Sequence, residues 1–241
     1  MLSLFIKVRW NVFNVALLCI VLVFTHCKKD DIGANTPVTP VITKDYLPLT
    51  TGSTFTYTDT TDGVASFYTL TASGVKINLF GKDYDKLNGS DGSVRYRTKT
   101  GTNYYQIISL PPMHSGEFED KYLNDSLPVN STWTESFKIV NVLGFPDSLI
   151  AFATYKISEK GVSRTVKGNA YTNVIHVALT DISAYNDSVA ANPMIVGIAT
   201  GNFYYSPGVG LIQSNVAIAD NSPYGINAAN SSQTLTSYTV K

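Results

Sequence analysis

Short runs in which apolar and polar residues alternate recur along most of this chain, and they constrain its fold more than any other feature. In residues 54–59, for example, Thr54, Thr56 and Thr58 alternate with Phe55 and Tyr57. A period of two is typical of a β-strand that buries one of its faces. Because no segment shows a convincing helical period, we expect the chain to fold from strands and turns.

Turn residues divide these runs into separate strands. The dipeptide Asp62-Gly63 favours a tight hairpin turn between strands at 54–59 and 64–72. Glycine, asparagine, aspartate or proline stands between nearly all the other runs. The further predicted strands cover residues 75–80, 84–87, 94–99, 104–110, 133–143, 149–158, 162–166, 172–182, 195–205, 210–218 and 234–240. Residues 183–191 are the one place where a short helix could form.

The composition agrees with a β fold. The chain has 15 tyrosines and 17 glycines, and threonine and valine are abundant. Tyrosine, threonine and valine suit a pleated surface, whereas glycine marks turns. Short connections favour antiparallel pairing of consecutive strands. We therefore predict a single all-β domain in residues 46–241, built as a large antiparallel curved sheet, a sandwich or an open barrel, with little helix.

The first 26 residues have the pattern of a secretory signal peptide. Lys7 and Arg9 supply positive charge, and residues 12–24 form an apolar stretch of 13 residues that only Asn14 interrupts. A short polar exit then leads to Cys27. A membrane-spanning helix needs about 20 apolar residues, so a cleaved leader is favoured over a permanent span.

The sequence VLVFTHCKKDD around Cys27 resembles the lipoprotein signal of Bacteroidota-type bacteria, in which an apolar run ends in a cysteine that Lys-Lys-Asp often follows. The pattern departs in His26, where such signals usually carry a small residue. The resemblance implies that Cys27 is lipidated in an exported protein of the outer membrane, which faces the periplasm or the cell surface. One acyl chain, such as palmitate, binds a membrane only marginally, so stable anchoring needs at least two.

Residues 27–45 contain the lipidated cysteine and a flexible tether. Pro37 and Pro40 favour extended chain, and the stretch has neither a helical nor an alternating period. In the same bacteria, a lysine followed by acidic residues resembles a signal for surface display, which Lys29, Asp30 and Asp31 fit. A charged, solvated linker explains these residues equally well.

Two short motifs extend the resemblance into the β domain. YLPLTTGSTFTY at residues 46–57 and FYYSPGVGLIQS at residues 203–214 resemble the start and the end of the β domain in uncharacterised lipoproteins of the same bacterial group. This resemblance implies no known activity.

Charge and cysteine content exclude several function classes. The chain has 18 basic and 18 acidic residues, and loss of Lys7 and Arg9 with the leader leaves 16 against 18, a net charge of −2. Without clustered basic residues, nucleic acid is not an expected partner. Cleavage before Cys27 also removes Cys19, so the remaining 241 − 26 = 215 residues hold one cysteine. An intrachain disulfide or a cysteine zinc site is then impossible.

No catalytic or metal-binding motif stands out. A G-x-S-x-G nucleophile motif is absent. His114 lies beside Glu117, Glu119 and Asp120 in a predicted loop, where the cluster could bind a metal. Exposed acidic loops are common, so no catalytic residue, metal or cofactor is predicted. The segment Glu117–Asp120 supports an envelope hydrolase only as an alternative.

Aromatic residues are the remaining candidates for ligand contact. Adjacent residues of a strand point to opposite faces, so one member of Tyr104-Tyr105 and one of Tyr204-Tyr205 should face outward. We predict Trp133, Tyr105 and Tyr204 as ligand-binding residues. Ordinary cross-strand packing is the competing explanation for all three.

These features predict a membrane-anchored, non-enzymatic β domain that binds a glycan, a lipid or another protein of the cell envelope. The alternatives are an envelope hydrolase and a structural component of an outer-membrane complex. An apolar concave pocket would favour a lipid ligand, a flat face with exposed aromatic residues would favour a glycan, and convergent carboxylates would favour an enzyme.

Overall fold

A computed structural model describes residues 45–109, 117–139, 149–186, 197–220 and 228–241, all of which belong to one compact unit. The predicted leader, Cys27 and the tether up to residue 44 lie outside the described residues, as does His114. No helix in the described part of the chain is long and apolar enough to cross a membrane.

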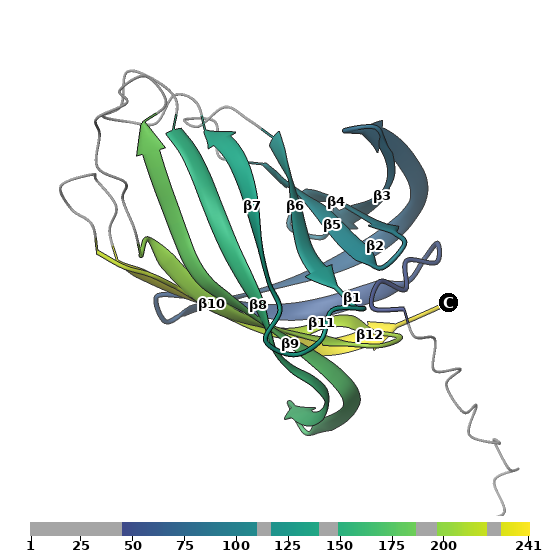
Figure 1. Cartoon of the computed structure of the whole chain (residues 1–241). Coiled ribbons are helices and arrows are strands. Elements are labelled where there is room, and N and C mark those ends of the chain that lie inside the picture. Colours follow the sequence, from purple (N-terminus) through teal and green to yellow (C-terminus); the bar gives the residue numbers. More distant parts are fainter. Residues whose placement is uncertain (1–44, 110–116, 140–148, 187–196, 221–227) are drawn as a thin grey trace, which may run out of the picture. The chain divides into compact units, whose positions relative to one another are not determined.

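The described residues form twelve β-strands and no helix (Figure 1). The strands are β1 (Thr54–Thr61), β2 (Val64–Leu79), β3 (Lys82–Gly89), β4 (Val94–Thr100), β5 (Asn103–Ser109), β6 (Glu117–Asn124), β7 (Thr132–Ile139), β8 (Leu149–Val166), β9 (Asn169–Asn186), β10 (Ala199–Ser206), β11 (Gly210–Ile218) and β12 (Ala229–Thr239).

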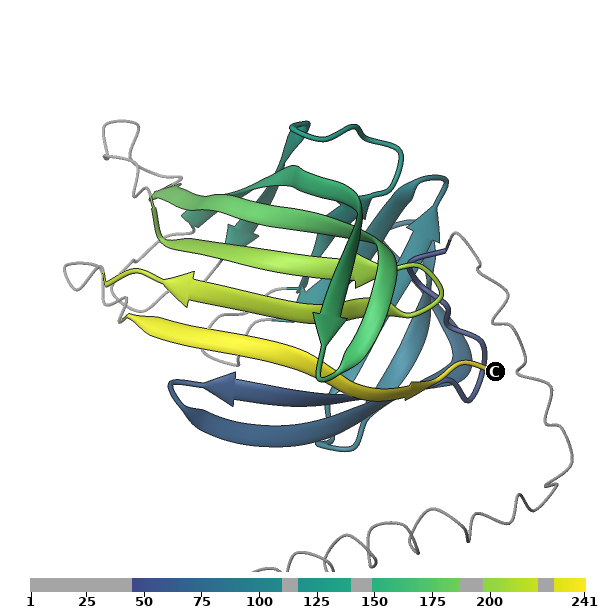
Figure 2. The same cartoon turned by 90° about the horizontal axis from the view of Figure 1, so that it is seen from below.

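All twelve strands belong to one antiparallel sheet in the order β6-β5-β4-β3-β2-β1-β12-β11-β10-β9-β8-β7. Except for β6 and β7, strands that follow each other in sequence are neighbours in the sheet, and β12 pairs with β1, as Figure 2 shows. The sheet curls so that its two edge strands, β6 and β7, approach each other. The predicted all-β antiparallel fold is confirmed, and among the three predicted architectures the domain adopts a nearly closed barrel.

Two-residue turns fix the register of several hairpins. Asp62-Gly63 joins β1 to β2 with φ angles of 48° and 84°, as the sequence predicts. Phe80-Gly81 and Lys167-Gly168 have the same combination, with φ angles of 50° and 75° and of 50° and 81°. Positive φ at both central residues matches the right-handed twist of the adjoining strands.

Two predicted strand breaks are bulges within longer strands. The expected strands at 64–72 and 75–80 form one strand, β2, whose register shifts between Ala72 and Lys76 around Gly74, where φ is +77°. The expected strands at 149–158 and 162–166 likewise form β8, which contains Gly161 with φ of +76°. Glycine at a bulge bends a strand without ending it.

Two further expectations were wrong. Residues 117–124, where the sequence predicts no strand and where Glu117, Glu119 and Asp120 are assigned to an exposed acidic loop, form β6, because Phe118 and Tyr122 alternate with polar residues and bury their rings. Residues 183–186 continue β9 in place of the short helix considered for 183–191, whose remainder lies outside the described residues.

The N-terminal segment of the domain covers one end of the barrel. Tyr46 and Leu47 are buried in the larger of two core clusters, and the Gly208 N–H donates to the Asp45 carbonyl at 2.7 Å. The connections β2–β3, β8–β9 and β10–β11 turn at this same end. We call it the plugged end, and the tether joins the domain there.

Candidate functional site

Side chains, rather than a backbone ladder, close the seam between β6 and β7. The Trp133 indole N–H donates to the Lys121 carbonyl at 2.8 Å, and the Lys121 ammonium lies 2.8 Å from the Glu135 carboxylate. The rings of Phe118 and Phe137 stack with centroids 4.0 Å apart. These contacts hold the two edge strands together, so the barrel has a defined interior.

A buried carboxyl group lies inside the barrel next to this seam. Asp120 is only 3% exposed and accepts hydrogen bonds from Gln106 and from the Tyr155 hydroxyl, each at 2.9 Å. Burial raises the pKa of Asp120 to about 6, although both hydrogen bonds act in the opposite direction, and the charge of Glu135 raises it further. Asp120 is therefore an acid whose charge changes near neutral pH.

Three basic residues follow one face of β4. Arg95, Arg97 and Lys99 are each two positions apart, so their side chains leave the same face of the strand. Arg97 is paired with Gln106 in β5, and Gln106 with the buried Asp120 in β6. Paired residues share a face of the sheet, which places the three basic side chains on the inner face of the barrel.

The two arginines lie among buried tyrosines from both core clusters. Arg97 donates to the Tyr57 hydroxyl, which in turn donates to the Leu211 carbonyl at 3.0 Å. Arg97 also lies near Tyr68, Tyr122 and Tyr205. Tyr57 and Tyr68 belong to one core cluster, and Tyr122 and Tyr205 to the other, so Arg97 lies where the clusters meet. Burial raises the pKa of Tyr57 to about 12, which keeps its hydroxyl protonated at physiological pH.

Arg95 contacts the same aromatic group from nearer the strand's start. Its guanidinium donates to the Tyr68 hydroxyl at 3.0 Å and lies 4.5 Å from the centre of the Tyr68 ring. Arg95 and Arg97 are both only half-buried, although they face the interior. Part of the surface of each arginine residue therefore stays exposed to solvent.

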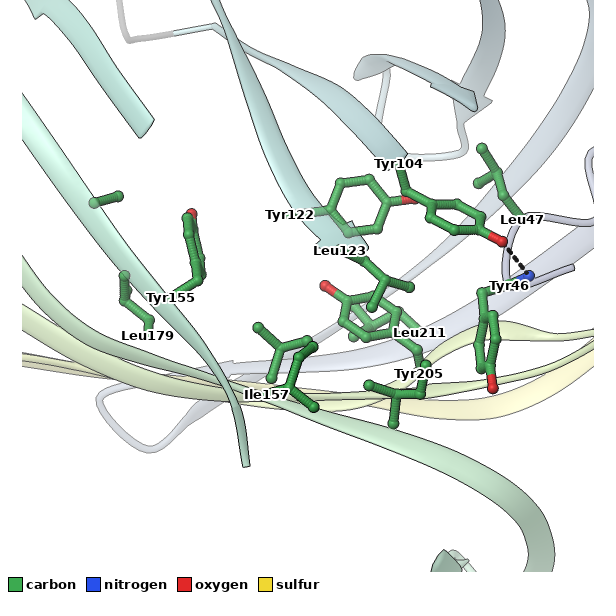
Figure 3. Packing of buried hydrophobic residues seen from close by; sticks show 13 residues of the cluster. Tyr46, Leu47, Tyr104, Tyr122, Leu123, Tyr155, Ile157, Leu179, Tyr205 and Leu211 are labelled. Atoms are coloured by element: carbon green, nitrogen blue, oxygen red, sulfur yellow. Dashed lines mark hydrogen bonds between the residues drawn. The ribbon is translucent and has the colours of Figure 1, made fainter. Parts of the chain in front are cut away.

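Lys99, the third basic residue, belongs to the plugged end. Its ammonium lies 4.8 Å from the centre of the Tyr104 ring and 3.4 Å from the Asp45 carboxylate. The Tyr104 hydroxyl donates to Asp125 at 2.7 Å and accepts from the Tyr46 N–H at 3.4 Å, the contact marked in Figure 3. Lys99 therefore already has a carboxylate partner, unlike the two arginines.

Trp133, the first predicted ligand-binding residue, lies at the seam. Its ring stacks on Tyr155 with centroids 5.4 Å apart, and its N–H is bonded to Lys121. These contacts are structural, because they join β7 to β8 and to β6. Contact of Trp133 with a ligand stays a prediction.

Tyr105 and Tyr204 both lie on the outer face of the sheet, as the alternation of adjacent tyrosines predicts. The Lys82 ammonium covers the Tyr105 ring at 4.4 Å from its centre. The Arg164 guanidinium lies 3.4 Å from the centre of the Tyr204 ring, and His176 stacks on that ring at 4.4 Å. No described contact joins Trp133, Tyr105 and Tyr204, and their binding of a ligand also stays a prediction.

The carboxyl groups of the acidic segment Glu117–Asp120 do not point to one common site. Successive residues of β6 point to opposite faces, so Glu117 and Glu119 lie on the face opposite Asp120. Glu119 accepts from Lys82 at 2.7 Å and from the Tyr84 hydroxyl. Within the described part of the chain, no group of three histidine, cysteine, aspartate or glutamate residues could hold a metal ion.

The inner arginines are the feature that the sequence reasoning missed. The segment Val94–Thr100 reads VRYRTKT, with a basic residue at every second position. In a chain of nearly balanced charge, cations on one face of a strand are a visible signal.

Comparisons with known proteins support the fold. No protein-family model and no curated protein matches the chain. A solved structure of a candidate lipoprotein from Parabacteroides distasonis ATCC 8503 is 13% identical, covers 82% of this chain and 99% of its own, and has a TM-score of 0.51. A second, of a candidate exported protein with a YmcC-like fold from Bacteroides fragilis NCTC 9343, is 11% identical, covers 80% and 98%, and has a TM-score of 0.42. The first likeness shows a shared fold.

Proposed function

We propose that this chain is an outer-membrane lipoprotein, anchored through Cys27, whose barrel binds a small ligand of the cell envelope without transforming it. The anchor rests on the leader and on the resemblance around Cys27. The protein of Parabacteroides distasonis that shares the fold is itself described as a candidate lipoprotein, which supports the same assignment.

One observation carries the binding function. Arg95 and Arg97 face the inside of the barrel, yet both stay partly accessible. Charged side chains are seldom placed in a protein interior unless they have a partner there. A barrel of moderate size commonly holds one small ligand among its inner side chains. We therefore place the ligand site at these arginines and not at the outer tyrosines, whose rings Lys82, Arg164 and His176 contact.

Binding is favoured over hydrolysis by the arrangement of the acids. A glycoside hydrolase, for example, needs two carboxyl groups that flank one bond. Glu117 and Glu119 lie on the opposite face of β6 from Asp120, so the segment that motivated the hydrolase alternative supplies no such pair. Asp120 therefore has a structural role next to the seam of the barrel, where it accepts a hydrogen bond from Tyr155.

The anchor is tested by metabolic labelling. Full-length chain is expressed in a Bacteroidota host that is fed labelled palmitate, as wild type, Cys27→Ala and Cys19→Ala. We expect label in the wild type and in Cys19→Ala, because Cys19 leaves with the leader, and none in Cys27→Ala. Separation of the two membranes should place the labelled protein in the outer one. Persistent label in Cys27→Ala would disprove the anchor.

A further inference from the structure

The two arginines inside the barrel lack a carboxylate partner. Among the described residues, no ion pair joins Arg95 or Arg97 to an acid. Their contacts are with tyrosine hydroxyls and rings. The pKa of Asp91, just before the start of the strand, is lowered by a hydrogen bond from Ser93 and also by the charge of Arg95. Asp85 is paired with Arg97 across the strands, but its carboxylate forms an ion pair with Lys76 at 2.9 Å. Asp120, the buried acid, is bonded to Gln106 and Tyr155.

Two neighbouring arginines without a carboxylate partner cost free energy, and a bound anion would offset that cost. Arg95 and Arg97 lie two residues apart on one strand face, a separation of about 6.6 Å along the strand. Two like charges on neighbouring side chains of one strand face repel each other, and partial burial strengthens the repulsion because the local dielectric is lower than in water. Tyrosine hydroxyls stabilise a guanidinium by hydrogen bonds but do not neutralise its charge.

The same groups suit an oxyanion. A guanidinium presents N–H donors in a planar fork that matches the two oxygens of a carboxylate or phosphate. The Tyr68 hydroxyl accepts from Arg95 and keeps its own proton for a further hydrogen bond, and burial raises the pKa of Tyr68, so the hydroxyl stays protonated at physiological pH. Neither arginine residue is fully buried.

Resting on the proposed binding function, we propose that Arg95 and Arg97 bind the carboxylate or phosphate group of a small anionic ligand inside the barrel. The group lies between the two guanidiniums, with the Tyr68 hydroxyl as a further hydrogen-bond donor. An acidic lipid and an acidic sugar both carry this chemistry, and the test separates them.

The test is a titration of detergent-extracted, full-length wild type with palmitate, galacturonate, inorganic phosphate and the neutral alcohol hexadecanol. Trp133 is the only tryptophan beyond the leader, so its fluorescence reports binding, and calorimetry gives the affinity. We expect at least one of the three anions to bind. Palmitate alone would identify a lipid source, galacturonate alone an acidic sugar, and phosphate alone a phosphorylated ligand.

Variants decide whether the arginines carry the binding. Arg97→Gln should weaken binding of the anion at least tenfold. Arg97→Lys keeps the charge but loses the planar set of N–H donors, so it should weaken binding less. Arg164→Gln makes the same charge change on the outer face and should leave the affinity unchanged. Circular dichroism confirms that each variant is folded, and Arg95→Gln replaces Arg97→Gln if the latter is not.

Two results would overturn the inference. The first is that no anion binds the wild type. The second is that an anion binds Arg97→Gln and the wild type equally well. If hexadecanol binds both proteins equally and the anions bind neither, the barrel is still a binding domain, so the proposed function stands while the oxyanion site is disproved.

Discussion

Asp120 is the one acid among the described residues whose side chain is almost wholly buried. A carboxylate in such a place is stabilised only by its hydrogen bonds, which here come from Gln106 and Tyr155. Burial outweighs them and favours the neutral acid, which is why the pKa rises to about 6 from 3.8. The folded chain therefore binds a proton at Asp120 more tightly than the unfolded chain does.

This pKa makes the stability of the domain depend on pH. The contribution of Asp120 to the free energy of unfolding is full below about pH 4 and falls as the pH rises through about 6, by up to about 3 kcal/mol. Asp120→Asn should remove this dependence, as measured by urea unfolding between pH 4 and 7 with Trp133 fluorescence. Asp91→Asn is the control, because a hydrogen bond from Ser93 lowers the pKa of Asp91. A wild type and Asp120→Asn with parallel pH profiles would refute the assignment.

At the scale of elements, the seam between β6 and β7 is where the barrel depends most on side chains. Every other neighbouring pair of strands in the sheet order shares a backbone ladder. Across the seam, Trp133 bonds the Lys121 carbonyl, and Tyr155 in β8 reaches over β7 to Asp120 in β6. The buried Tyr155 hydroxyl is therefore a direct contributor to closure.

Tyr155→Phe should weaken this closure. It leaves the Asp120 carboxyl buried with one hydrogen bond fewer, which typically costs about 1–3 kcal/mol. Tyr185→Phe removes the same atom from a residue that is 37% exposed, and should change the free energy of unfolding by less than about 0.5 kcal/mol. Chemical unfolding at pH 7 measures both. Equal effects of the two variants would mean that Tyr155 does not stabilise the seam.

The sequence predicts the elements of this barrel better than it predicts its interior. Alternation and the turn at Asp62-Gly63 depend on neighbours in the chain, so both appear in the sequence. β6 was not predicted, because its many charged residues make the alternation of buried rings hard to recognise in the sequence. The group around Arg97 depends on contacts between strands as distant as β1 and β10, which only the curl of the sheet creates.

At the scale of the whole molecule, the tether enters at the end that Tyr46 and Leu47 cover. Both termini of the domain lie there, because β12 pairs with β1 and the Lys241 N–H donates to Ser53 at 3.2 Å.

Native mass spectrometry of full-length protein, extracted from the membranes of its host, tests the binding claim most directly. We predict that the wild type carries, beyond its lipidated polypeptide, a noncovalently bound small acid that dissociates on denaturation. Arg97→Gln should lack it, while Arg164→Gln should retain it. Two results would contradict binding of a small acid by Arg97. One is a wild type whose native mass equals that of the lipidated polypeptide alone, and the other is an Arg97→Gln protein that carries the same molecule.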